Sequence, residues 1–211
     1  MILRFFLLIS GLFTRVFAPE DLLEGRFRIL PESKVFLAGT TNVNKFKCDC
    51  GNTFDPQKFQ LDLNPQQLMD FTGTSLQLPV IYFDCKNGKM DRDLQKALKA
   101  EQYPYIGIEL KQFSMYPGEI PLSGSDEGLP SLAKVNITIA GVTRSYEIPV
   151  RTTRDAHLQF RFTGKKTMNM TDFNISPPVA LFGMIKVDDP ITFHFNLLVH
   201  AEVLPGKTLL Q

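Results

Sequence analysis

The chain has 211 residues, enough for one large domain or two small ones. Its 23 basic and 22 acidic residues give a formal net charge of +1, which argues against nucleic acid as a partner because phosphate backbones are bound through excess positive charge. Apolar residues make up 44% of the chain, and they include 18 Phe, so the sequence predicts either a Phe-rich packed core or a cavity lined for an apolar ligand.

The first 18 residues have the pattern of a signal peptide. A positively charged start, MILR, precedes the apolar run FFLLISGLF, and Ala18 is a small residue suited to cleavage. The apolar run is too short for a stable transmembrane anchor, and no later run is longer. We therefore expect cleavage after Ala18 and a single exported domain over residues 19–211, without a membrane anchor; an uncleaved interfacial helix is the alternative.

Export would place the three Cys in an oxidising compartment, where disulfides persist. Cys48 and Cys50 lie two apart on an extended segment, so they face the same way and do not readily bridge each other. One bridge from Cys85 to either of them is plausible, with Cys48 favoured slightly and no bridge as the alternative. A Cys-x-Cys metal site is weakly supported because no His lies nearby, so we expect neither a metal nor a cofactor.

The first half of the chain contains segments in which apolar and polar residues alternate, as in half-buried strands. We expect strands over residues 26–30 and 34–38 as a hairpin, and then over 59–63 and 76–83. The stretch between them over residues 39–46 is polar and rich in turn residues.

Residues 90–102 predict the one convincing helix. Its apolar face is formed by Met90, Leu94, Ala97 and Leu98. We expect Asp91 as the N-cap, and Pro104 should stop the helix near Gln102. The alternation that follows predicts a strand over residues 105–113.

After a loop expected over residues 116–130, the strand pattern is clearest. The expected strands cover residues 135–140, 146–151, 158–163 and 191–199, with turns at 141–143 and 164–166 and a short extended piece at 168–170. About eight strands and one short helix indicate an all-β fold, either two packed sheets or a closed antiparallel barrel. An eight-stranded barrel has an interior that side chains fill or that holds one small ligand.

Five segments, from residue 33 to residue 199, stand in the order found in the YceI-like family, which the chain resembles over about residues 27–199. The most specific are the aspartate-led helix ending in Tyr103-Pro104, the stretch ITIAGVT at Ile137–Thr143, and DFNI at Asp172–Ile175. In the last, Asn174 replaces the usual glycine of the family. Of the family's common His-Ser pair near the first strand, only Ser33 is present.

The resemblance implies a lipocalin-like barrel with an apolar interior, exported to the bacterial periplasm or beyond, that binds a polyisoprenoid-like lipid. The inward candidates for ligand contact, each of which could also be plain core, are Leu94, Leu98, Ile106, Ile108, Ile137, Phe160, Phe162, Phe193 and Phe195. A polar headgroup could meet basic residues expected on loops, namely Arg144, Arg151, Arg154, Lys165 and Lys166.

Two other classes of function fit the sequence less well. A hydrolase would need a nucleophile with its base, but neither G-x-S-x-G nor H-E-x-x-H occurs, and His157, His194 and His200 show no partner spacing. We therefore do not expect an enzyme. A structural or interaction protein that displays loops from a sandwich with a filled core is the stronger alternative, and the sequence leaves open whether two chains pair.

Overall fold

The structure, a computed structural model, describes residues 22–51, 54–63, 68–116, 128–154, 159–180 and 184–204. The expected signal peptide, most of the loop expected over residues 116–130, and His157 lie outside these ranges.

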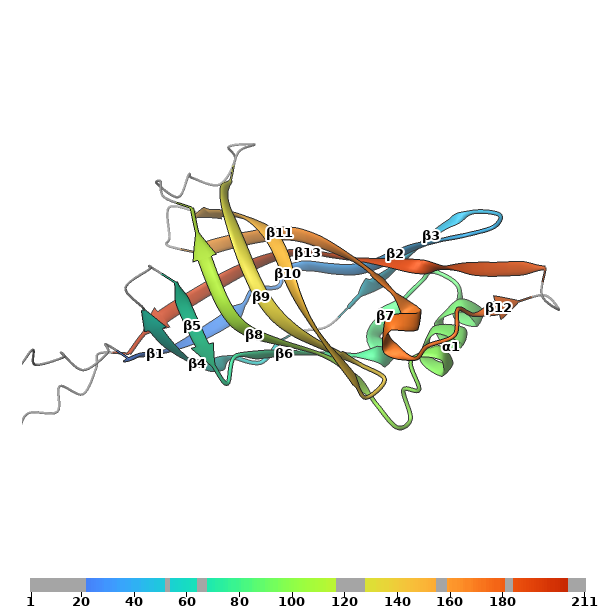
Figure 1. The fold of residues 1–211 in the computed structure, drawn as a ribbon, viewed down its shortest axis with the longest axis horizontal. Coiled ribbons are helices and arrows are strands. Elements are labelled where there is room, and N and C mark those ends of the chain that lie inside the picture. Colours follow the sequence, from blue (N-terminus) through green and yellow to red (C-terminus); the bar gives the residue numbers. More distant parts are fainter. Residues whose placement is uncertain are drawn as a thin grey trace, which may run out of the picture.

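The described residues contain thirteen strands in one antiparallel arrangement, together with one α-helix and two short 3₁₀ turns (Figure 1). The strands are β1 (Leu22–Ile29), β2 (Lys34–Thr41), β3 (Lys45–Cys50), β4 (Gln57–Leu63), β5 (Met69–Thr72), β6 (Ser75–Pro79), β7 (Phe83–Asp84), β8 (Tyr105–Met115), β9 (Leu129–Ile139), β10 (Val142–Arg154), β11 (Gln159–Asn169), β12 (Val179–Ala180) and β13 (Ile185–Val203). The helix is α1 (Gly88–Ala97), and the 3₁₀ turns are η1 (Val80–Tyr82) and η2 (Met170–Phe173).

Eight of the strands close into a ring. Their order is β1-β4-β5-β8-β9-β10-β11-β13, and β13 pairs back onto β1 through residues 199–203. Closure leaves these strands without the unpaired edges that an open sheet would expose. The predicted all-β barrel with one α-helix is thereby confirmed.

The predicted hairpin of the first two strands is wrong. β13 is 19 residues long, and it pairs with β1 near its C-terminal end and with β2 along its N-terminal part, so β1 and β2 lie end to end beside it. The turn between them is fixed to β13 because the Ser33 Oγ accepts a 2.9 Å hydrogen bond from the Leu198 amide. The turn residues Pro31-Glu32-Ser33 therefore do not reverse the chain, and β2 runs in the same direction as β1.

Two further strand predictions need correction. The strand expected over residues 76–83 is interrupted by η1, where the buried Val80 donates its amide to the Pro104 carbonyl at 2.9 Å instead of to a strand. The turn expected at residues 164–166 is absent, because β11 runs without a break from Gln159 to Asn169. The turn expected between β9 and β10 does form, at Ala140 and Gly141, which both have positive φ (48° and 79°).

The helix begins at Gly88, three residues before Asp91, which the sequence predicted as its N-cap. Asn87 is the N-cap, and its Oδ1 accepts hydrogen bonds from the amides of Lys89 and Met90 at 3.0 and 3.2 Å. Asp91, predicted as the cap, lies in the first turn and accepts a 2.7 Å hydrogen bond from the Cys85 amide. α1 ends at Ala97, five residues before the predicted stop, and Lys99 has a left-handed φ of 53°.

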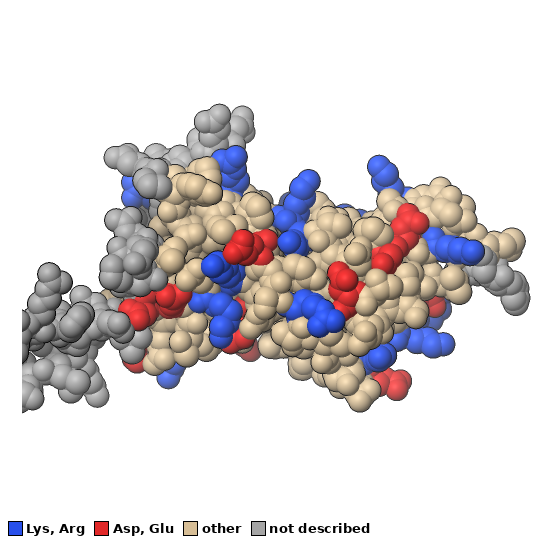
Figure 2. Space-filling model, in the orientation of Figure 1, with Lys and Arg blue, Asp and Glu red and all other residues tan. Residues whose placement is uncertain are grey.

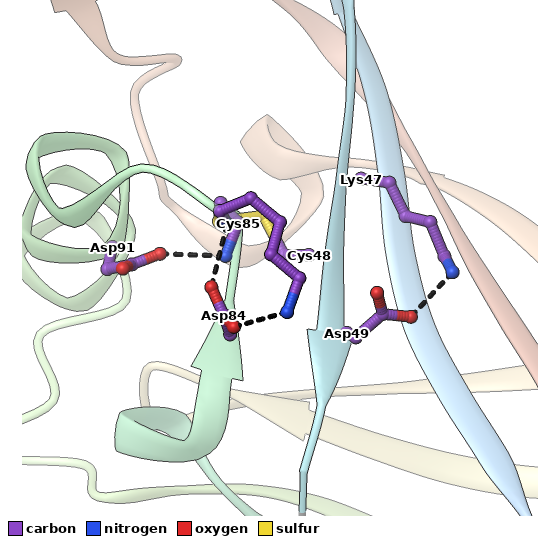
Figure 3. Close-up of polar contacts among 7 residues, drawn as sticks. Lys47, Cys48, Asp49, Asp84, Cys85 and Asp91 are labelled. Carbon is purple, nitrogen blue, oxygen red and sulfur yellow. Dashed lines mark hydrogen bonds and ion pairs between the residues drawn. A yellow bond between two sulfur atoms is a disulfide. The ribbon is translucent and has the colours of Figure 1, made fainter.

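A disulfide joins Cys48 of β3 to Cys85, the residue after β7 (Figure 3). The two strands pair through only two residue pairs, Asp49 with Asp84 and Cys50 with Phe83. The covalent bond therefore secures the shortest pairing along the path that leads from β13 through β2 and β3 toward α1.

The ends of the molecule differ in packing. α1 and β7 lie at one end, and β1, β4 and β5 lie at the other (Figure 1). The side chains that are most completely buried include several from segments near α1, among them Leu78, Val80, Phe83, Cys48 and Phe173. Acidic and basic side chains are interspersed over the face seen in Figure 2, in keeping with the small net charge. Within the described ranges, no helix is long and apolar enough to cross a membrane.

Candidate ligand cavity

The ring of eight strands encloses a cavity of about 460 Å³. Inward-facing residues of every ring strand line it, because successive side chains of a strand point to opposite faces of the sheet. The contributions from the two long strands β8 and β13 are Ile108, Leu110, Phe113 and Met115, and Phe193, Phe195, Leu197, Val199 and Ala201. A volume of this size is within the range of roughly 300–1,000 Å³ that is typical of small-molecule sites.

The lining is apolar and aromatic. Its described residues include eight Phe side chains and no charged residue. Several rings contact one another, as in the edge-to-face pair of Phe113 and Phe162, whose centroids lie 5.6 Å apart. The lining residue Thr152 is 1% exposed, and its hydroxyl is 2.9 Å from that of Ser131, so this polar group is already satisfied within the wall. An ionised group placed in this cavity would lose its hydration without gaining a partner, so the site suits an uncharged, apolar chain.

Six of the nine residues proposed from the sequence as ligand contacts line the cavity: Ile108, Ile137, Phe160, Phe162, Phe193 and Phe195. Leu94, Leu98 and Ile106 do not. Ile106 is 3% exposed and pairs across the strands with the fully buried Leu78, in the packed part of the core. Leu94 belongs to α1 and Leu98 is its C-cap, and this helix covers the packed end and not the cavity.

Sequence reasoning missed the part of the lining that comes from β1, β4 and β5. These residues are Phe27, Ile29, Phe59, Leu61, Met69 and Phe71. The alternation of Phe59 and Leu61 with polar residues was a usable signal, since inward positions of a barrel strand recur at every second residue. β5 has only four residues, too few for a period of two to be recognised.

The basic residues proposed for a headgroup lie on strands and not on loops. Arg144, Arg151 and Arg154 belong to β10, and Lys165 and Lys166 belong to β11. None of the five lines the cavity. Lys166 instead places its Nζ 4.8 Å from the centroid of the Tyr146 ring. The prediction that these cations sit on loops is therefore wrong, and the cavity offers no cationic partner within the described residues.

The two described histidines lie outside the cavity. His194 stacks on Phe36, with ring centroids 4.4 Å apart and an angle of 10° between the planes. Burial lowers the pKa of His194, and the charges of Lys165 and Lys47 lower that pKa further. His200 lies 3.0 Å from a carboxylate oxygen of Glu202. In the part of the chain that the structure describes, no group of three or more His, Cys, Asp or Glu residues could hold a metal ion.

Comparisons with known structures agree on the fold. A Burkholderia cenocepacia protein, BcnA, is 17% identical, with a TM-score of 0.54 over 80% of this chain and 96% of that one. A domain from Saccharophagus degradans, described as a polyisoprenoid binding domain implicated in plant cell wall breakdown, is 10% identical, with a TM-score of 0.54 over 83% of this chain and 98% of that one. At such identities the likeness concerns the fold alone.

Sequence comparison gives the family. Among curated proteins, no sequence is significantly similar to this chain. The profile of the family described as YceI-like domain matches residues 32–199, which is most of the chain and includes all or part of every ring strand except β1. The chain therefore belongs to the YceI-like family.

Proposed function

We propose that this protein is an exported, non-catalytic carrier that holds a long apolar ligand, isoprenoid-like in character, in the barrel cavity. The observation that carries the proposal is the cavity lining, whose described residues combine eight Phe side chains with no charged group. Membership of the YceI-like family supports it, and so does the structural likeness to a domain described as binding polyisoprenoids.

The volume of the cavity allows an estimate of the free energy of binding. At about 30 Å³ per carbon, taking the liquid volume of a water molecule as a guide, 460 Å³ holds roughly 15 carbons. Burying them contributes about 0.8 kcal/mol each, or about 12 kcal/mol in total. Against an association cost of about 4 kcal/mol, at the low end of estimates, about 8 kcal/mol is left, which corresponds to micromolar affinity.

The test is native mass spectrometry of the protein purified from its own host, followed by organic extraction. We expect a bound species of lipid mass that is lost in Phe195→Asp, because the new carboxylate would lie uncompensated in the cavity. Val43→Asp is the matched control, since Val43 is 62% exposed. Circular dichroism establishes that each variant is folded.

A second variant tests the cavity even if Phe195→Asp does not fold. Ala133→Phe adds apolar volume to the cavity without adding charge. If folded Ala133→Phe and Phe195→Asp bound prenyl alcohols as well as the wild type does, the cavity would not be the ligand site. The same mass spectrum tests export, since cleavage after Ala18 would give a chain that starts at Pro19.

A further inference from the structure

The outer wall of the barrel carries a groove of about 1070 Å³, whose lining shares Val150 and Phe195 with that of the cavity. It crosses the outer faces of β2, β13, β11, β10 and β9. Of the described residues, Lys34, Arg151 and Lys165 line it, and no Asp or Glu does. A local excess of one charge sign is unexpected in a chain whose net charge is +1.

The pairing of the strands places these basic side chains close together. Lys34 on β2 pairs with Asn196 on β13, which pairs with Thr163 on β11, and Thr163 pairs with Arg151 on β10. Directly opposed residues have Cβ atoms about 4.5–5.5 Å apart, so this row spans roughly 15 Å. Lys165 lies two residues along β11 and pairs with His194. The basic side chains are therefore neighbours on one face of the sheet, although Lys34 is far from the other two in the sequence.

Among the residues that the structure describes, no carboxylate neutralises the positive charge in the groove. In the described ranges, none of the ion pairs involves Lys34, Arg151 or Lys165. The carboxylate of Asp49, on nearby β3, already pairs with Lys47 at 2.6 Å. Arg161 adds a further cation at the border, where its Nη1 donates a 2.6 Å hydrogen bond to Asn196 Oδ1.

The same groove has apolar walls. The Phe36 ring stacks on His194, and Leu132, Pro130 and Pro149 line the far side. Tyr116, which is 63% exposed, lies at one end. Basic side chains next to exposed aromatic and aliphatic ones are the combination that binds at the headgroup level of a membrane, where anionic groups and apolar chains lie close together.

We propose that this groove, defined by Lys34, Phe36, Arg151, Lys165 and Tyr116, docks the protein on the surface of an anionic phospholipid bilayer. The groove and the cavity adjoin, since Met115 lines the cavity and Tyr116, the next residue, lines the groove. Docking therefore brings the cavity close to the bilayer that is its source of lipid. None of the five residues that define the groove lines the cavity, so the test of docking does not depend on ligand uptake.

The test is flotation of the purified full chain with vesicles of phosphatidylcholine, with and without phosphatidylglycerol. Each basic residue near an anionic surface contributes about a fivefold change in partitioning. Lys34→Gln/Arg151→Gln/Lys165→Gln should therefore bind vesicles that contain phosphatidylglycerol roughly 100-fold more weakly. Wild-type binding should weaken as salt is raised, because the Debye length shortens.

The control removes the same charge elsewhere. Lys58→Gln/Lys89→Gln/Lys96→Gln changes three exposed lysines on β4 and α1, outside the groove, and should retain binding. Equal loss in both triple variants, or equal wild-type binding to neutral vesicles, would overturn the proposal. Binding to soluble polyglutamate without binding to vesicles would overturn it in favour of an acidic protein partner.

Discussion

Phe195 lies across Gly164 on the neighbouring strand, so closely that a Cβ on residue 164 would be 2.5 Å from the Cζ of the ring. The two residues are directly paired between β11 and β13. Phe195 lines the cavity, so the missing side chain of Gly164 makes room for part of the cavity wall. Gly164 lies within a strand and not in a turn, and it allows the Phe195 ring to approach the backbone closely.

Gly164→Ala should destabilise the barrel by about 1–3 kcal/mol, because the Phe195 ring must shift within a packed wall. Urea unfolding followed by circular dichroism measures this change. Gly107→Ala on β8 is the control, since the nearest atom to its added Cβ, in the Gln77 side chain, would be 3.5 Å away. Adding Phe195→Leu to Gly164→Ala should restore part of the loss. A Gly164→Ala variant as stable as Gly107→Ala would contradict the account.

Loss of the disulfide should lower the free energy of unfolding by roughly 4 kcal/mol in the chain-entropy estimate, given a sequence separation of 37 between Cys48 and Cys85. The measurement is urea unfolding of Cys48→Ala/Cys85→Ala beside the wild type with and without a reductant. The cavity residues lie away from the bridge, so a folded double variant should keep its affinity for a prenyl alcohol. A loss of affinity with no loss of stability would show that the bridge shapes the cavity and does not merely secure the β3–β7 pairing.

Acid should weaken the folded state through His194. Burial and the charges of Lys165 and Lys47 lower its pKa, so the unfolded chain, with a pKa of about 6.5, binds the proton more readily than the folded one. This stability contribution is present above about pH 6.5 and is lost as the pH falls toward the folded pKa. His194→Gln should reduce the fall in Tm between about pH 7.5 and pH 5.

The direct check is an NMR titration of the His194 ring in the folded protein. Its pKa should lie below that of a histidine in an unfolded peptide, and Lys165→Gln should raise it because one repelling charge is removed. A His194 pKa at or above the peptide value would show that the stacking on Phe36 does not desolvate the ring.

The alternation of apolar residues was enough to predict an all-β fold and much of its apolar inner face, but it left open whether two sheets pack or one sheet closes. The barrel was predicted from the resemblance to the YceI-like family. Phe193 and Phe195 could be assigned to the inner face because apolar residues alternate without a break over residues 191–199 of β13. Pairing partners could not be assigned, since alternation says which face a residue is on but not which strand lies beside it. The end-to-end placement of β1 and β2 depends on Ser33 bonding to Leu198, a contact across 165 positions that no local pattern reveals.

The helix shows a second limit. The apolar spacing correctly predicted a helix, but it did not show which part of the core the helix covers. The helix is joined to the packed end by the hydrogen bond from the Cys85 amide to Asp91, next to the disulfide at Cys85. Leu94 and Leu98 therefore cover core and not cavity. Asn174, which departs from the family's glycine, is a different case: its φ of 56° and ψ of 34° are left-handed, a conformation that Asn tolerates better than most residues, so the fold absorbs the change.

Ligand chain length should have a measurable limit. A cavity of 460 Å³ holds roughly 15 carbons, so affinity should rise steeply from a prenyl alcohol of two isoprene units to one of three. A fourth unit should add little, because its carbons would extend beyond the apolar lining. The measurement is displacement of an uncharged fluorescent isoprenoid probe by the three alcohols below their aggregation limits.

The control for this series is Ala133→Phe, which fills part of the cavity and should move the plateau to a shorter chain. A steady gain for every added unit in the wild type would mean that the chain follows a longer path than the described cavity. An affinity independent of chain length would mean that the ligand is held at its polar end, which the uncharged lining does not favour.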